Sequence, residues 1–274
     1  MIDYSATQTL IESMVSERVV PGVNYAFINN EQIFTSTIGF ASIYPTVTQL
    51  SPFAEYDLAS LTKVLITENI LLKLYQENEL NFSEPLHQFI PEFTDERVRL
   101  FHLMTHTSGI RGWIEHRDEL SHDKLLDAII HLPVTNEFEH KMRYADTNFI
   151  LLGLVIKKIF GKPVQEVGQT ELIDVMKLAN TTFHPTKSAC VPTALFNGKV
   201  LQGIPHDPKA QQLGSDCGSA GLFSTLHTCF TGVLILLDRV RKSGLILLTN
   251  RVHPTGHNQI FLPNLVKNNA ITCH

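Results

Sequence analysis

The chain lacks several features that would place it in a specialised class of proteins. Among its 274 residues no apolar stretch approaches the ~20 residues that cross a membrane, and the N-terminus has no basic segment followed by an apolar run. The four cysteines contain no C-x-x-C pair, and their spacing resembles neither a zinc site nor a secreted disulfide framework. We therefore expect reduced thiols, no membrane contact and a cytoplasmic location.

Long blocks of like charge and internal repeats are absent as well. The 22 basic and 27 acidic residues are spread along the chain, so the net charge of −5 gives no electrostatic footprint for nucleic acid. The 43% hydrophobic content is enough to bury a large core in one or two lobes. We expect a globular protein that binds a small molecule, with no cofactor and no bound metal.

Apolar periodicity predicts the main elements of secondary structure. The expected elements are an N-terminal helix ending near Pro21, strands over 23–28 and 32–39, helices over 60–76 and 149–160, and a hairpin over 230–238 and 244–250. The helix over 149–160 is entered through Asp146 and closed by Gly161.

Strands at both ends of the chain, with helices between them, favour an α+β fold over repeated βαβ units. We expect an antiparallel sheet flanked by N- and C-terminal helices, with an all-helical lobe inserted. The sheet lobe is assigned to 1–59 and 215–274, and the mostly helical lobe with its loops to 60–214, within one compact catalytic unit.

The tetrad Ser60-Leu61-Thr62-Lys63 stands at the start of the helix expected over 60–76. Residues three apart on a helix share a face, so the Lys63 amine can approach the Ser60 hydroxyl, which is a poor nucleophile until a base takes its proton. Lys63 must be neutral to act as that base, because an ammonium cannot accept a proton. The free N–H groups of a helix start would favour negative charge at the Ser60 oxygen.

Four stretches together make the chain resemble the serine β-lactamase-like hydrolases, which include class C β-lactamases, penicillin-binding proteins and related esterases. They are residues 57–63, 103–109, 143–149 and 218–225. The resemblance extends from Pro21 to about Pro254. It implies a β-lactamase/transpeptidase-like fold with the site in the cleft between its two parts.

The resemblance also implies roles for individual residues. Ser60 would be the nucleophile, Lys63 its proton acceptor, and Tyr144 a second acid/base that passes the proton to the leaving group. Asp146 stands where the family's Y-x-N pattern usually has Asn, and would contact substrate. Two interpretations of Asp146 stay open, because it would also serve as the N-cap of the following helix or as a carboxylate close to Lys63.

The stretch His227-Thr228-Cys229 resembles the family's K-T-G or H-T-G strand, with the Phe230 N–H completing an oxyanion hole. His227, Thr228 and Phe230 are therefore expected to bind substrate. Two departures accompany this match: Cys229 replaces Gly, and part of the segment usually found before His227 is missing. A histidine is mostly neutral at pH 7, which favours esters over penicillins, and the shortened segment suggests a homodimer that covers apolar surface.

The preferred hypothesis is a carboxylesterase that forms an acyl-enzyme on Ser60 with a small ester or amide substrate. The alternatives are a D-alanyl carboxypeptidase or β-lactamase-type penicillin-binding protein, and a catalytically silent binding or regulatory homologue. His102 and His106 have the i, i+4 spacing of metal-binding pairs, but no Glu follows His102 as in H-E-x-x-H. We expect these two histidines to be packing or hydrogen-bonding groups.

Overall fold

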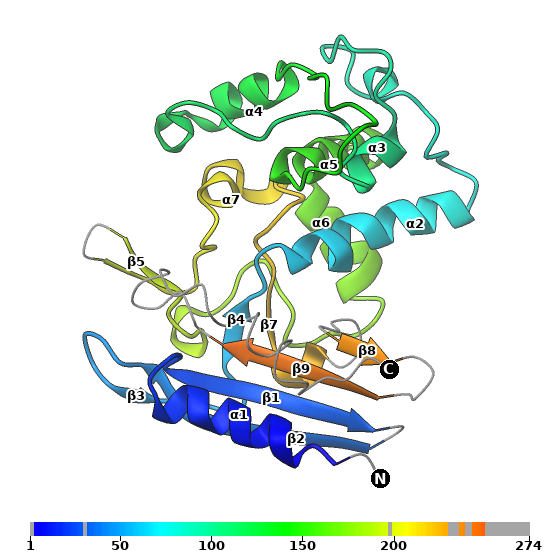
Figure 1. Cartoon of the computed structure of the whole chain (residues 1–274). Coiled ribbons are helices and arrows are strands. Elements are labelled where there is room, and N and C mark those ends of the chain that lie inside the picture. Colours follow the sequence, from blue (N-terminus) through cyan, green and yellow to red (C-terminus); the bar gives the residue numbers. More distant parts are fainter. Residues whose placement is uncertain (1–2, 30–31, 197–198, 230–235, 239–242, 250–274) are drawn as a thin grey trace. The chain divides into compact units, whose positions relative to one another are not determined.

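A computed structural model describes residues 3–29, 32–196, 199–229, 236–238 and 243–249 (Figure 1). The chain forms two compact units, which we call the sheet unit and the helical unit. The sheet unit takes in Met1–Asp57, His184–Ile204 and Phe223–His274, and the helical unit takes in Leu58–Phe183 and Pro205–Leu222.

The sheet unit is built around one five-stranded antiparallel sheet with the strand order β3-β2-β1-β9-β8. Its helices and strands are α1 (Ser5–Ser16), β1 (Gly22–Asn29), β2 (Gln32–Ser42), β3 (Thr48–Gln49), β4 (Glu55–Asp57), β5 (Ala194–Phe196), β6 (Lys199–Leu201), β7 (Phe223–Thr225), α8 (Leu226–Cys229), β8 (Leu236–Asp238) and β9 (Ser243–Thr249), with a 3₁₀ turn at Lys187–Ala189. The pairing of β1 with β9 brings together segments more than 200 residues apart in the chain. The expected N-terminal hairpin and the described parts of the expected C-terminal hairpin, β8 and β9, therefore belong to one sheet, while residues 230–235 of the latter lie outside the described residues.

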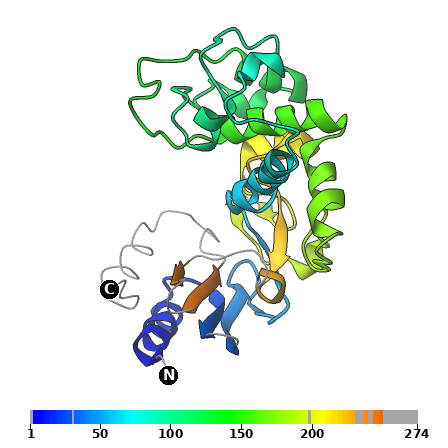
Figure 2. The same ribbon diagram turned by 90° about the vertical axis from the view of Figure 1, so that its right-hand side faces the viewer.

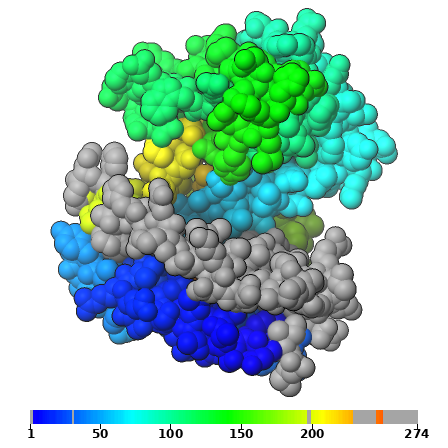
Figure 3. All heavy atoms as spheres, in the orientation of Figure 1, coloured from blue at the N-terminus to red at the C-terminus, as the bar shows by residue number. Residues whose placement is uncertain are grey.

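The core of the sheet unit lies between α1 and one face of the sheet (Figure 2). Alternate residues of β1, namely Val23, Tyr25 and Phe27, point to this face and contact Ile11 and Met14 of the helix. Each such side chain contributes about 1.5–3 kcal/mol when it is fully buried. The opposite face of α1 is polar and lies at the molecular surface (Figure 3).

Two short strand pairs complete the sheet unit, namely β4 with β7 and β5 with β6. Residues 184–204 also belong to the sheet unit. Their backbone next to Cys190 runs beside β4, and the Val191 N–H donates a hydrogen bond to the Glu55 carbonyl at 2.9 Å. The units thus differ from the expected lobes in three segments, since 184–204 joins the sheet unit while 58–59 and 215–222 belong to the helical unit.

The helical unit contains the remaining helices of the described chain. They are the π-helical segment η1 (Lys63–Thr67), α2 (Glu68–Gln76), α3 (Leu100–Met104), α4 (His122–Ile130), α5 (Asp146–Phe160), α6 (Val164–Gly168), the π-helical segment η4 (Gln169–Ile173) and α7 (Pro208–Leu213), with 3₁₀ turns at Leu86–Gln88, Arg117–Glu119 and Gly214–Asp216. Because η1 runs directly into α2, the expected helix over 60–76 is present with a π-helical first part.

The helix α5 forms the centre of the helical unit. Nine of its fifteen residues are buried, including the run Thr147–Gly153, so it is apolar around most of its circumference rather than along one stripe. It ends at Gly161, which adopts the left-handed conformation with φ of 68° as expected for a glycine after a helix. The first turn of α5, which begins at Asp146, is thereby fixed in a rigid core.

The expected α+β class is confirmed: helices and an antiparallel sheet assembled from distant segments are both present. The N-terminal helix is present as α1, while the expected C-terminal helices lie outside the described residues. No helix in the described ranges is long and apolar enough to span a bilayer.

Candidate active site

The Lys63 amine lies against the Ser60 hydroxyl, as the spacing predicts. Its Nζ is 2.7 Å from the Ser60 Oγ. Ser60 immediately precedes the helix and is an exposed residue, whereas Lys63 is only 2% exposed. The pair therefore joins an accessible alcohol to a buried amine within one turn of chain.

The backbone that presents Ser60 is held in an uncommon conformation. Ala59 has a φ of +45°, a left-handed geometry that costs a residue with a Cβ about 1–3 kcal/mol. The hydroxyl of Thr62 donates to the Ala59 carbonyl at 2.7 Å and accepts from the Leu222 N–H at 3.2 Å. Thr62 thus ties the turn before Ser60 to the 218–222 loop of the same unit.

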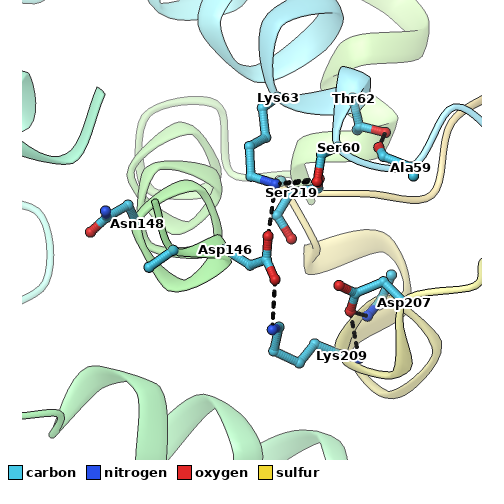
Figure 4. A network of polar contacts seen from close by, with 12 residues as sticks. Ala59, Ser60, Thr62, Lys63, Asp146, Asn148, Asp207, Lys209 and Ser219 are labelled. Atoms are coloured by element: carbon cyan, nitrogen blue, oxygen red, sulfur yellow. Dashed lines mark hydrogen bonds and ion pairs between the residues drawn. The ribbon is translucent and has the colours of Figure 1, made fainter. Parts of the chain in front are cut away.

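Lys63 makes three polar contacts, all inside the helical unit (Figure 4). Besides Ser60, its Nζ lies 2.8 Å from Asp146 Oδ1 and 3.3 Å from the Ser219 carbonyl oxygen. A neutral amine has two N–H groups and one lone pair. In this structure the Lys63 Nζ donates to all three oxygens, and a neutral amine in the same place would donate to Asp146 and the Ser219 carbonyl and turn its lone pair to the Ser60 hydroxyl.

The Ser219 carbonyl is positioned by a tight approach of the preceding residue to α5. A Cβ on Gly218 would lie 2.4 Å from the Phe149 carbonyl oxygen, so only glycine fits there. The Thr67 hydroxyl, one turn beyond Lys63, donates to the Gly218 carbonyl at 2.7 Å. The loop is therefore fixed by both the helix that bears Lys63 and the helix that bears Asp146.

Asp146 is not the N-cap of α5. The N-cap is Ala145, and Asp146 is the first helical residue, with its side chain 21% exposed. Its carboxylate bridges two lysines, since Oδ1 accepts from Lys63 and Oδ2 accepts from Lys209 Nζ at 2.7 Å. Of the two interpretations of Asp146, the capping one is wrong and the contact with Lys63 is confirmed.

The electrostatics of the carboxylate follow from these contacts. Burial alone would raise the pKa of Asp146, but the hydrogen bonds donated by Lys209 and Lys63 outweigh burial and lower the pKa to about 2. Asp146 is therefore an anion throughout the neutral range. Lys209, which is 6% exposed, is the member of this cluster that the sequence did not reveal.

Tyr144 lies beside Lys63 with its ring rather than its hydroxyl against the amine. The Lys63 Nζ is 4.8 Å from the ring centroid, and the tyrosine is 59% exposed. Within the described residues its hydroxyl makes no hydrogen bond. The structure thus brings Ser60, Lys63, Tyr144 and Asp146 together, while a proton relay through the phenol would need the ring to reorient.

His106 supports the ring of Tyr144. The two rings are tilted at 47° with centroids 4.6 Å apart. Its Nδ1 accepts from the Asn148 amide at 2.9 Å, and Asn148 in turn accepts from the Ser108 hydroxyl at 2.7 Å. Burial first, and the positive charge of Lys63 second, lower the pKa of His106, so its ring is neutral at pH 7.

His102 is a structural residue of α3 and not a partner of His106. Its Nδ1 accepts from the Arg99 N–H at 3.0 Å, and its Nε2 lies 2.9 Å from Glu139 Oε1. Across the described part of the chain, no three His, Cys, Asp or Glu side chains converge as metal ligands.

The stretch around His227 is not the strand we expected. Leu226–Cys229 forms the helical turn α8, and Thr225 accepts the Thr228 N–H at 3.4 Å through its hydroxyl. Threonine is common directly before a helix, because its hydroxyl can accept a hydrogen bond from a backbone N–H of the first turn. This local preference for a helix prevails here over the strand that the resemblance to K-T-G predicted. The His227 ring stacks on Phe53 at 5.1 Å within the sheet unit.

Three of the expected substrate-binding residues remain predictions. His227 and Thr228 belong to the sheet unit, whereas Ser60 and Lys63 belong to the helical unit. Phe230, whose N–H was expected in the oxyanion hole, lies outside the described residues.

Comparison with known proteins agrees with this geometry. The model of the Beta-lactamase family matches residues 7–230, which is most of the chain. The chain belongs to the Beta-lactamase family. Its match includes all four stretches on which the resemblance rested and ends at residue 230, directly after α8.

Two curated relatives have low sequence identity to this chain and are longer than it. The chain is 23% identical over 261 residues to a "Putative D-alanyl-D-alanine carboxypeptidase" of Salmonella agona, covering 80% of this chain and 60% of the relative. It is 25% identical over 220 residues to an "N-acetylmuramyl-L-alanine amidase" of Bacillus subtilis, covering 67% and 50%. The chain thus spans between half and about three fifths of the length of these proteins.

Solved structures share the fold. A class C beta lactamase from Rhodobacter sphaeroides has a TM-score of 0.66 at 17% identity, covering 82% of this chain and 63% of that one. A D-stereospecific amidohydrolase from Streptomyces has a TM-score of 0.64 at 25% identity, covering 84% and 72%. The expected β-lactamase-like architecture is confirmed.

Proposed function

We propose that the chain is a serine hydrolase that cleaves small acyl esters through an acyl-enzyme on Ser60. The observation that carries this proposal is the 2.7 Å contact between the exposed Ser60 hydroxyl and the buried Lys63 amine. A hydroxyl beside a buried amine is the arrangement that nucleophilic catalysis requires, because the base is held within reach of the proton it removes.

The reaction follows from the hydrogen-bond pattern. The lone pair of neutral Lys63 takes the Ser60 proton while the Oγ attacks the acyl carbonyl, and the negative charge that develops on the carbonyl oxygen lies near the helix start. Collapse breaks the bond to the leaving oxygen, which receives a proton through Tyr144, and leaves an ester on Ser60. Water then attacks this ester by the same steps and restores the free enzyme.

A neutral ester suits the charges of the helical unit better than an anionic substrate does. The lysine amino groups nearest Ser60 face Asp146, and the neighbouring Arg143 binds both carboxylate oxygens of Glu137 at 2.6 Å. These basic groups are paired with internal carboxylates. A substrate carboxylate would have to compete with them, which supports an uncharged acyl ester as the preferred substrate.

A second candidate is a carboxypeptidase or amidase acting on D-amino acid derivatives. The names of the Salmonella and Bacillus relatives, and the Streptomyces amidohydrolase, favour it. D-alanyl-D-alanine ends in a carboxylate, so this activity needs a cation in addition to those already paired. His227, if it faces the substrate, would supply that charge only when protonated.

Labelling and turnover test these proposals in sequence. Intact-mass analysis after exposure to a short-chain fluorophosphonate should show one covalent adduct in wild type and none in Ser60→Ala. Ser121→Ala is the matched control, because Ser121 is an exposed serine of the same unit whose side chain caps no helix. Absence of any adduct in wild type would refute the enzyme and leave the silent binding homologue.

The substrate class is then set by three assays on the same protein. We expect turnover of p-nitrophenyl acetate and much slower turnover of nitrocefin and of a D-alanyl-D-alanine peptide. Faster cleavage of the peptide than of the ester would replace the first candidate by the second.

A further inference from the structure

Lys209 is a buried lysine placed by its own short helix against the acidic residue of the site. Asp207 caps α7 by accepting the Lys209 N–H at 2.7 Å and the Ala210 N–H at 3.1 Å, and Pro208 is the first helical residue. This fixed turn directs the Lys209 side chain at Asp146 (Figure 4). The Lys209 side chain is only 7% exposed.

Burying a lysine ammonium costs free energy unless a nearby anion accepts hydrogen bonds from its N–H groups. Asp146 meets that need for two lysines at once, with one carboxylate oxygen each. When both lysines are protonated, the three groups carry a net charge of +1 in a largely buried place. Loss of one proton makes the cluster neutral.

Without Lys209, the net charge of the cluster favours the protonated form of Lys63 instead. Lys63 and Asp146 alone would be neutral as an ion pair, and removal of the Lys63 proton would leave a buried carboxylate with no cation. A lone carboxylate beside Lys63 would therefore hold it as an ammonium, which cannot act as a base.

We propose that Lys209 is a positioning residue that serves as the counter-ion of Asp146 and thereby allows Lys63 to be the neutral base for Ser60. This inference rests on the proposed function, since it concerns how the same serine is activated. Of the two lysines, Lys63 is the one whose amine contacts the Ser60 hydroxyl.

The other groups around Lys63 do not change this balance. The ring of His106 is neutral at pH 7, the Ser219 carbonyl is uncharged, and Tyr144 contacts the amine through its ring face. Asp146 and Lys209 are therefore the charged partners of Lys63 among the described residues, and a change at Lys209 should be visible in how activation of Ser60 depends on pH.

The test is the rate of Ser60 labelling by a short-chain fluorophosphonate between pH 5 and pH 10, measured by intact mass. In Lys209→Met the acid limb should move up by about one pH unit or more, so that labelling at pH 7 falls about tenfold and recovers in alkaline solution. Lys209→Arg keeps the charge and should keep the limb near its wild-type position.

Lys157→Met is the matched control. Lys157 belongs to the same unit and pairs with the buried Asp216 at 2.9 Å, but it lies outside the Ser60 cluster. Its removal should lower the melting temperature and leave the labelling profile unchanged.

The outcomes separate the two proposals. A Lys209→Met profile with the wild-type limb, or one lowered equally at every pH, would mean that Lys209 is merely structural, while Ser60 labelling would still stand. No labelling of wild type at any pH would overturn the proposed function and this inference together. Should Lys209→Met fail to fold, a wild-type limb near the 10.4 of an isolated lysine would refute the inference, and one well below it would support it.

Discussion

Replacing Asp146 by Asn should destabilise the helical unit in a way that depends on pH. The amide resembles a protonated Asp146, so the variant removes the negative charge while keeping the size of the side chain. It leaves Lys63 and Lys209, both almost fully buried, without the carboxylate that they share. Lost pairing of this kind is costly because the charges stay in place.

The magnitude follows from the pKa of Asp146. Its folded-state value of about 2 lies below the value of about 3.9 that the unfolded chain has, and each unit is about 1.4 kcal/mol. The ionised carboxylate therefore contributes about 2–3 kcal/mol to the free energy of unfolding at pH 7. Because the pKa is lowered on folding, this contribution is complete above about pH 5 and is lost as the pH falls towards about 2.

Urea unfolding followed by far-UV circular dichroism at pH 7, 5, 4 and 3 measures the effect. Asp146→Asn should lower the free energy of unfolding by at least about 2 kcal/mol at pH 7, and the gap to wild type should shrink steadily below pH 5. Asp174→Asn, at an exposed carboxylate of the same unit, provides the control for a general charge effect. A gap that is equal at pH 7 and pH 3, or absent at both, would refute the assignment of the carboxylate as the shared counter-ion.

Three further substitutions test the site and its support. Lys63→Met should abolish fluorophosphonate labelling of Ser60 at pH 7, and labelling at the wild-type rate would exclude this amine as the base. Tyr144→Phe should lower turnover of p-nitrophenyl acetate about 10²–10⁴-fold while leaving the melting temperature within a few degrees, and unchanged turnover would remove the phenol from the proton path. Gly218→Ala should cost about 1–3 kcal/mol in urea unfolding because its Cβ would meet a backbone oxygen of α5 at 2.4 Å, and an undiminished free energy of unfolding would show that the loop can yield.

The parts of the site that local spacing determines could be predicted from the sequence. Ser60 and Lys63 are three residues apart, and any helix beginning there brings them together. The start of α5 at Asp146 and its end at Gly161 are likewise encoded within one turn of chain by an acidic residue and a glycine. Such features depend on neighbours in the sequence and so need no knowledge of the tertiary fold.

Lys209 could not be found in this way. It is 63 residues from Asp146 in the chain, and no motif links the two. Its sequence signal is only that of a capped turn, Asp207 followed by Pro208, which indicates where a helix begins but not what that helix faces. The contact depends on where α7, which packs against α4, is placed in the tertiary fold, and a pattern of neighbouring residues does not encode that placement.

The error at His227 has the reverse cause. The strand was predicted because three residues, 227–229, resemble a family motif. Thr225, directly before Leu226, is a local signal for the start of a helix instead. Matches to three-residue motifs are common by chance, whereas a capping residue stabilises the start of a helix through a hydrogen bond. The placement of 184–204 failed for a similar reason, because a segment rich in turn residues gives no sign that its backbone will pair with β4.

The pairing of Asp146 with Lys209 gives a physical meaning to the departure at the third position of the Y-x-N pattern. A neutral Asn at this position could accept a hydrogen bond from Lys63 without favouring its charged form. A carboxylate there opposes the release of a proton by Lys63, and it does so more strongly because both groups are sheltered from water. A second cation on the other carboxylate oxygen offsets this effect. If Lys209 is the counter-ion that we propose, a lysine or arginine near residue 209 is expected in any relative that has Asp at this position and retains an active serine.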